Sequence, residues 1–232
     1  MKILPNPDWM NRCLTSLVRM IASHDKITGD QGRLVEDVVE QICHTAFLQD
    51  FVVRHPTFEK SRGRIKEAAD FLVPFRNTLL AFQVTSKNEP KPGSKKTETD
   101  LARIAGKTAG KGIDQLATIR RAVRSNRLPA LKNARNITIP FERSWVDRMI
   151  GVVIVDLLGE DKFPSEERTS IYDGYVCEDG MPIHLFRRQD FAFLLSEVDT
   201  LPEFIQYLDT RQQLFEKDIL GPFTQEPDFL AT

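Results

Sequence analysis

The chain has 232 residues, of which 41% are hydrophobic and 28% charged, and its net charge is −1. These values are ordinary for a single globular domain with its own core, so no disulfide framework is required. No stretch approaches the about 20 apolar residues of a membrane helix, and the three cysteines are an odd number without metal-binding spacing. The composition therefore predicts a cytoplasmic protein with reduced thiols and no membrane partner.

The first 60 residues predict two helices and a strand. Apolar residues at helical spacing predict a helix from Asp8 to about His24, within an N-terminal element spanning 1–29. A second helix follows, and Glu36 lies at the border of its apolar stripe. The apolar residues 51–53 predict the first strand.

Two apolar runs in the next segment predict a β-hairpin. The runs Ala69–Phe75 and Thr78–Val84 flank Arg76 and Asn77, a suitable two-residue turn. Both runs are apolar on both faces, which is typical of strands in the middle of a sheet.

The predicted hairpin brings polar side chains together. Its register places Asp70 opposite Gln83, and cross-strand partners point to the same face. Alternation adds Thr85 and Lys87 to that face, whereas Glu67, an odd number of positions from Asp70, is expected to face away. Carboxylate and amide oxygens suit Mg²⁺ or Mn²⁺, so we expect a metal site here.

The rest of the chain predicts one long helix, three strands and two further helices. A Pro-, Gly- and Lys-rich loop precedes a helix from Thr97 or Thr99 to about Ser125, whose glycines indicate close packing or a bend. The segment 160–180 is expected to be a polar loop. The predicted strands are 137–139, 149–158 and 183–186, and the predicted helices are 189–197 and 201–217.

This order of elements predicts an α/β fold with a mixed central sheet flanked by helices. We expect an α/β core over residues 30–160. A C-terminal strand and helices over 161–232 are expected to pack on that core.

The small net charge conceals an asymmetry. Residues 86–135 contain thirteen Lys or Arg against four Asp or Glu, whereas residues 155–232 contain six against seventeen. This division predicts a basic surface for a nucleic acid beside an acidic region, although two solvated helix faces would give the same pattern.

The hairpin sequence ADFLVPFRNTLLAFQVTSK resembles the core of the PD-(D/E)XK restriction-endonuclease-like nuclease superfamily. The signature of that superfamily is an Asp, a hairpin, and then Glu-x-Lys or Gln-x-Lys. Asp70 and Gln83 match it, and Glu36 matches an acid on the preceding helix. The segment 183–211 is similar to part of an uncharacterised bacterial branch, so the resemblance spans roughly residues 30–215.

The resemblance implies a restriction-endonuclease-like fold and Mg²⁺- or Mn²⁺-dependent hydrolysis of nucleic acid, with DNA expected, in defence or repair. It implies metal binding by the Asp70 carboxylate, the Gln83 amide oxygen, the Val84 carbonyl and Glu36. Lys87 would orient the attacking water or offset charge on the phosphate.

The resemblance also implies a nucleic-acid-binding helix after the hairpin. Lys111 and Gln115 match the basic helix that follows the core in exonuclease-like members, and Lys107 lies one turn earlier. These three residues would contact the nucleic-acid backbone.

One departure leaves the activity open. The superfamily lysine should lie two residues after Gln83, where this chain has Thr85, and Lys87 lies two residues further along. Either the lysine has moved, or the chain is an inactive nuclease-like module that binds nucleic acid or a partner protein. An interaction or immunity protein using the acidic C-terminal half is a third reading, and homo-oligomers are compatible with all three.

The remaining motifs predict no other site. The four histidines, His24, His44, His55 and His184, share no metal-ligand spacing with the cysteines. The chain has no Walker A, nucleophile-elbow or dinucleotide-binding pattern.

Overall fold

The structure is a computed structural model that describes residues 36–37, 52–60, 64–87, 98–128, 131–132, 137–139, 141–157, 174–198 and 200–217. The helix predicted for Asp8–His24 and the loop between residues 88 and 97 lie outside the described residues. Of the second predicted helix, only Glu36 and Asp37 are described, and both are helical.

A six-stranded mixed sheet forms the centre of the molecule, in the order β1-β4-β5-β8-β10-β9. Strands β5 and β8 are parallel, as are β8 and β10, and the other three pairs are antiparallel. The strands are β1 Val53–Arg54, β4 Phe71–Phe75, β5 Thr78–Lys87, β8 Arg148–Leu157, β9 Gly174–Glu178 and β10 Met181–Arg187. The predicted α/β class with a mixed sheet is confirmed.

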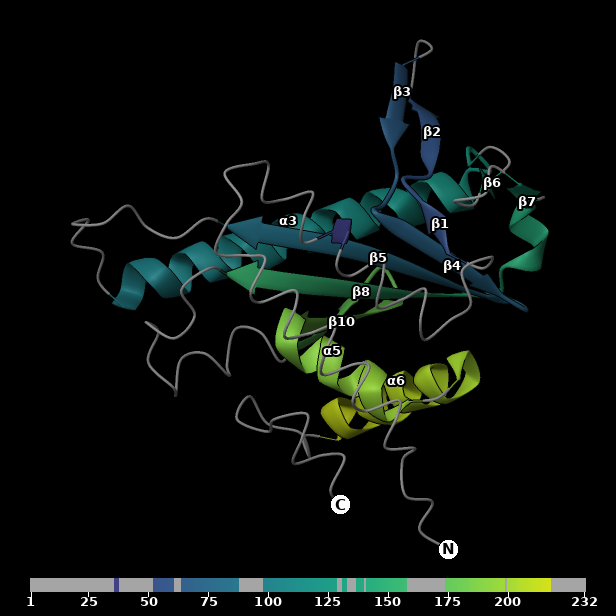
Figure 1. Cartoon of the computed structure of the whole chain (residues 1–232). Helices are drawn as coiled ribbons and strands as arrows, with labels where there is room; N and C mark the ends of the chain where they lie inside the picture. Colours follow the sequence, from purple (N-terminus) through teal and green to yellow (C-terminus); the bar gives the residue numbers. More distant parts are fainter. Residues whose placement is uncertain are drawn as a thin grey trace, which may run out of the picture.

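Helices cover both faces of this sheet, so the fold has three layers (Figure 1). Helix α3, Glu98–Arg124, lies on one face, and helices α5, Arg188–Glu197, and α6, Leu201–Glu216, lie on the other. Each face has its own apolar core: Leu79 and Ala81 of β5 pack on the α3 side, and Leu80 and Phe82 on the side of α5 and α6. Burial on both faces explains why the central strands are apolar throughout.

The register of the β4–β5 hairpin is as predicted. Phe71 pairs with Phe82 and Phe75 with Thr78, around a turn at Arg76 and Asn77. The C-terminal helices are also confirmed, since Thr200 and Glu203 form the capping box that opens α6.

Helix α3 approaches the sheet most closely at Gly112. A Cβ at this position would lie 2.7 Å from Val153 Cγ1 and 3.3 Å from Thr85 Cγ2, whereas Gly106 and Gly110 have open space. The predicted close packing therefore occurs at one glycine of the three.

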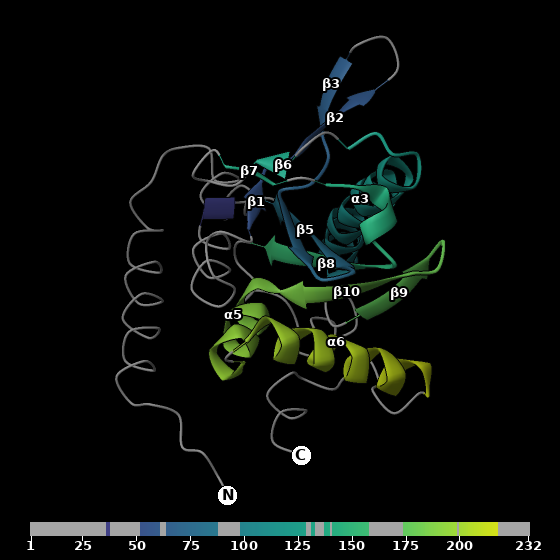
Figure 2. The same cartoon turned by 90° about the vertical axis from the view of Figure 1, so that its right-hand side faces the viewer.

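Several short strands were not predicted from the sequence. Strand β9 lies within the segment expected to be a polar loop, and it pairs with β10. It is half-exposed at the sheet edge, so it lacks the apolar run of a central strand. Strands β2, Thr57–Lys60, and β3, Arg64–Glu67, form a polar hairpin that projects away from the sheet (Figures 1 and 2).

Three short elements lie between α3 and β8 in the chain. Strands β6, Leu131–Lys132, and β7, Thr138–Ile139, pair with each other, and a 3-10 helix covers Arg143–Trp145. None of the helices in the described ranges is long and apolar enough to span a membrane.

Candidate metal centre

Asp70 immediately precedes β4 and lies between two cross-strand neighbours. Arg54 pairs with Phe71, and Phe71 pairs with Phe82. One position further along, the same registers place His55 opposite Asp70 on one side and Gln83 on the other. The His55 amide donates to the Asp70 carbonyl at 2.9 Å, which continues the β1–β4 ladder to this point.

The Asp70 carboxylate lies where the β4–β5 ladder ends. Gln83 Nε2 donates to Asp70 Oδ2 at 2.5 Å, and the Val84 amide donates to the same oxygen at 2.6 Å. The side chain therefore accepts a hydrogen bond from a main-chain amide of β5 that a carbonyl of a longer β4 would otherwise accept. Asp70 is only 6% exposed.

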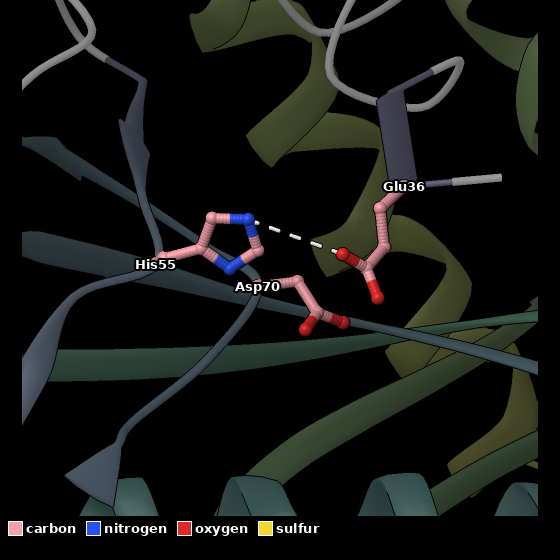
Figure 3. A group of neighbouring side chains, drawn as sticks. All are labelled: Glu36, His55 and Asp70. Carbon is pink, nitrogen blue, oxygen red and sulfur yellow. Dashed lines mark ion pairs between the residues drawn. The ribbon is translucent and has the colours of Figure 1, made fainter. Parts of the chain in front are cut away.

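His55 and Glu36 complete a cluster around Asp70 (Figure 3). One possible ligand atom from each of the three residues lies within 4.8 Å of the others. His55 Nε2 lies 3.9 Å from Glu36 Oε2, and His55 Nδ1 contacts Glu67 Oε1. A carboxylate on one ring nitrogen is the arrangement that orients a metal-binding imidazole through the other.

The pKa values of both carboxyl groups in the cluster are raised. Burial is the main cause that raises the pKa of Asp70, and the charges of Glu36 and Glu67 also raise it. The hydrogen bonds from the Val84 amide and the Gln83 side chain lower it, and the net pKa is about 7. Burial also raises the pKa of Glu36, while His55 lowers it. A divalent cation would relieve the repulsion between these carboxylates, so the site has the electrostatics of an ion-binding site.

The residues predicted for the site have different outcomes. The structure brings Asp70, Gln83 and Glu36 to one place. Gln83 faces Asp70 through its nitrogen, and Val84 contacts it through its amide, whereas both were expected to offer oxygens. The Val84 carbonyl points to the same side of β5 as the Val84 amide. Its predicted role as a metal ligand stays a prediction.

Lys87 is the last residue of β5, and its side chain lies outside the described part of the chain. Thr85, at the position of the superfamily lysine, is buried under α3 beside Gly112. Its Oγ1 has no hydrogen-bond partner among the described residues.

The predicted nucleic-acid contacts lie on α3. Lys107 and Lys111 are exposed and Gln115 is half-buried. Their spacing of four residues places them along one side of the helix. Gly112 of this helix lies against Thr85 of β5. The row formed by these three residues therefore lies close to the strand that carries Gln83.

Two residues at this site were not predicted from the sequence: His55 in the cluster and Glu67, which contacts it. His55 shares no metal-ligand spacing with the cysteines, so the sequence does not predict it as a ligand, and strand alternation predicts that Glu67 faces away from Asp70. The expectation for Glu67 is wrong because β3 ends at that residue and the chain leaves the strand before Asp70, so alternation does not carry across. The signal for His55 in the sequence is its place two residues after the predicted strand 51–53.

No protein-family model, curated protein or solved structure matches this chain.

Proposed function

We propose that this chain is a metal-dependent nuclease of the PD-(D/E)XK type that hydrolyses phosphodiester bonds of nucleic acid, with DNA as the expected substrate. The observation that carries the proposal is the meeting of Glu36, His55 and Gln83 around the buried carboxylate of Asp70. This cluster occupies the hairpin whose sequence resembles the superfamily core. A hairpin in the middle of a mixed sheet flanked by helices is compatible with a restriction-endonuclease-like fold.

Asp70, Glu36 and His55 would hold Mg²⁺ or Mn²⁺. When bound, the ion supplies an activated water and neutralises charge at the scissile phosphate. His55 favours Mn²⁺ of the two, because imidazole is a softer ligand than the oxygens that Mg²⁺ prefers. Glu67 holds the imidazole by its other nitrogen.

The other residues would act on the substrate. Lys107, Lys111 and Gln115 would follow the phosphate backbone along α3. Lys87, at the end of β5, would place a positive charge beside the attacked phosphate.

One observation favours the second candidate, an inactive module that binds nucleic acid. Thr85 lies under α3, and Gly112 approaches it so closely that a long side chain at position 85 would be overpacked. The position of the superfamily lysine is therefore closed. Activity then depends on Lys87 taking over its function.

The test is cleavage of linear and circular DNA and of RNA with Mg²⁺, Mn²⁺ or a chelator. Wild type should cleave only with metal, and Asp70→Asn should abolish cleavage while retaining nucleic-acid binding. Glu197→Gln, which removes an exposed carboxylate at the end of α5, is the matched control for Asp70→Asn and should cleave as wild type does. If wild type binds nucleic acid but cleaves none with either metal, the inactive module is the correct reading.

A further inference from the structure

A second polar site lies at the C-terminal end of α3. A cavity of about 150 Å³, open to solvent on one side, is lined by the last turns of α3, the segment leading into β8, and the β9–β10 turn. Arg148, which lines it, pairs with Thr78 at the start of β5, five residues before Gln83. At about 3.3 Å per residue, the cavity lies roughly 16 Å along the strand from the metal centre.

Arginine dominates the lining of this cavity. Four guanidinium groups face one carboxylate, and these charged lining residues are Arg120, Arg124, Arg143, Arg148 and Asp147. The Asp147 carboxylate accepts a hydrogen bond from Asn77 Nδ2 at 2.8 Å, and Arg148 forms an ion pair with Asp209 of α6. The remaining three arginines have no ion pair with any carboxylate that the structure describes.

Main-chain carbonyls hold two of these arginines in place. Arg120 Nη1 donates to the Glu178 carbonyl at 2.7 Å, and Arg143 Nη1 donates to the Val146 carbonyl at 2.5 Å. A carbonyl fixes a guanidinium without neutralising its charge. Each fork therefore keeps further N–H donors for an anion.

Arg120 is the most informative of the group because it is only 7% exposed. The β9–β10 turn covers it: a Cβ at Gly180 would lie 3.6 Å from Arg120 Nη2. Burial, followed by the charge of Arg124, lowers the pKa of Arg120, and Asp179 offsets this in part. A buried cation without a paired anion is costly, and a bound anion would remove that cost.

We propose that this arginine pocket, formed by Arg120, Arg124 and Arg143, binds one phosphate group. Guanidinium forks match phosphate oxygens in geometry as well as charge. The volume of about 150 Å³ is below that of typical pockets for whole cofactors, so it suits a single phosphate. The site requires neither the metal nor cleavage, and thus goes beyond the proposed nuclease.

The phosphate can be a free anion or the end of a nucleic-acid strand. Trp145, two residues from Arg143, is 48% exposed, and an exposed aromatic ring offers a base a stacking surface. The arms of the test separate these two sources of the same chemistry.

The test is calorimetric titration of the full chain with inorganic phosphate, with a chelator present and at constant ionic strength. Saturable binding is expected for wild type. Arg143→Gln and Arg124→Gln should each weaken it at least about tenfold, which corresponds to about 1.4 kcal/mol. Arg121→Gln, an exposed neighbour outside the pocket, removes the same charge from the same helix and should bind as wild type does.

Three oligonucleotide arms identify the source. A 5′-phosphorylated, a 3′-phosphorylated and an unphosphorylated strand compete with inorganic phosphate. Stronger competition by a phosphorylated strand assigns the pocket to that strand end, whereas equal competition assigns it to a free anion. The proposal is overturned if wild type does not bind phosphate, or if Arg143→Gln and Arg124→Gln bind it as wild type does. Because the chelator removes metal, neither outcome depends on the nuclease site.

Discussion

Gln83 Nε2 donates to Asp70 Oδ2 at 2.5 Å across the β4–β5 hairpin, and the next amide along β5 donates to the same oxygen. These bonds favour the charged carboxylate, whereas burial and the nearby Glu36 and Glu67 disfavour it. The opposing effects leave the pKa of Asp70 at about 7. Small changes around Asp70 therefore alter its charge near neutral pH.

Without metal, Asp70→Asn should be more stable than wild type at pH 8. The difference in stability between the two proteins should be smaller at pH 5. The folded pKa of Asp70 is raised from 3.8 to about 7, so stability present below about pH 4 is lost as pH rises to 7. At 1.36 kcal/mol per pKa unit, the loss is up to about 4 kcal/mol. Urea unfolding with a chelator at both pH values measures the part of this loss that falls between pH 5 and pH 7, which is about 3 kcal/mol. A difference between the two proteins that does not change with pH would contradict the charge argument.

Mn²⁺ should bind more tightly at pH 8 than at pH 6, because the ion requires the deprotonated form of Asp70. Glu67→Gln should weaken Mn²⁺ binding by about tenfold or more, since it loosens the orientation of His55. Titration calorimetry measures both effects, with Glu197→Gln as the matched exposed carboxylate. If Glu67→Gln binds Mn²⁺ as wild type does, the imidazole is not a ligand oriented by Glu67.

The hairpin could be read from the sequence because its strands are apolar and its turn is short. Those two features fix the register, and the register brings Asp70 opposite Gln83. The central strand β8 and the helix α3 were predictable for a similar reason, since each carries a sustained apolar pattern. Strand β9 was not, because it lies at a sheet edge and is half-exposed.

The place of His55 beside Asp70 could not be predicted, because it depends on how a strand of only two residues, β1, pairs with β4. β1 covers only Val53 and Arg54, and His55 follows it in a left-handed conformation with φ of 45°. No periodicity marks so short a strand, and its register with β4 is set by tertiary contacts. Glu67 enters the cluster because the chain changes direction between β3 and β4, which strand alternation does not anticipate.

Gly112→Ala should destabilise the fold by about 1–3 kcal/mol, because the new methyl group would overlap Val153 Cγ1. Gly110→Ala is the matched control on the same helix. It meets open space, so it should stabilise by up to about 1 kcal/mol through helix propensity alone. Thermal or urea unfolding compares the two. Similar effects of both alanines would mean that α3 does not lie against the sheet at Gly112.

Lys111→Gln should weaken nucleic-acid binding and lower the slope of log affinity against log salt by about 1, because one phosphate contact is lost. The loss should be the same for different sequences, since a phosphate contact carries no base information. Fluorescence anisotropy over a salt series measures the slope. Lys217→Gln, an exposed lysine at the end of α6, should leave it unchanged. An unaltered slope in Lys111→Gln would remove this residue from the interface.

Lys87→Ala tests whether the displaced lysine acts in catalysis. Thr85 is closed off by α3, so a catalytic lysine can come from β5 only further along the strand, and Lys87 is the next residue on the same alternation. Removing one positive charge that stabilises the transition state costs about 10²-fold in rate, and binding should change far less. Single-turnover cleavage with Mn²⁺ measures the chemical step, and Lys217→Ala is the matched control.

If Lys87→Ala lowers the cleavage rate and saturating substrate does not restore it, Lys87 acts in catalysis. If the variant cleaves at the wild-type rate, the displaced-lysine assignment is wrong, and Asp70 with its bound ion must account for the activity without it. Thr85→Val addresses the other half of the argument. Because the Thr85 hydroxyl has no partner among the described residues, valine should keep both stability and cleavage, whereas a loss of cleavage would give that hydroxyl a role in the site.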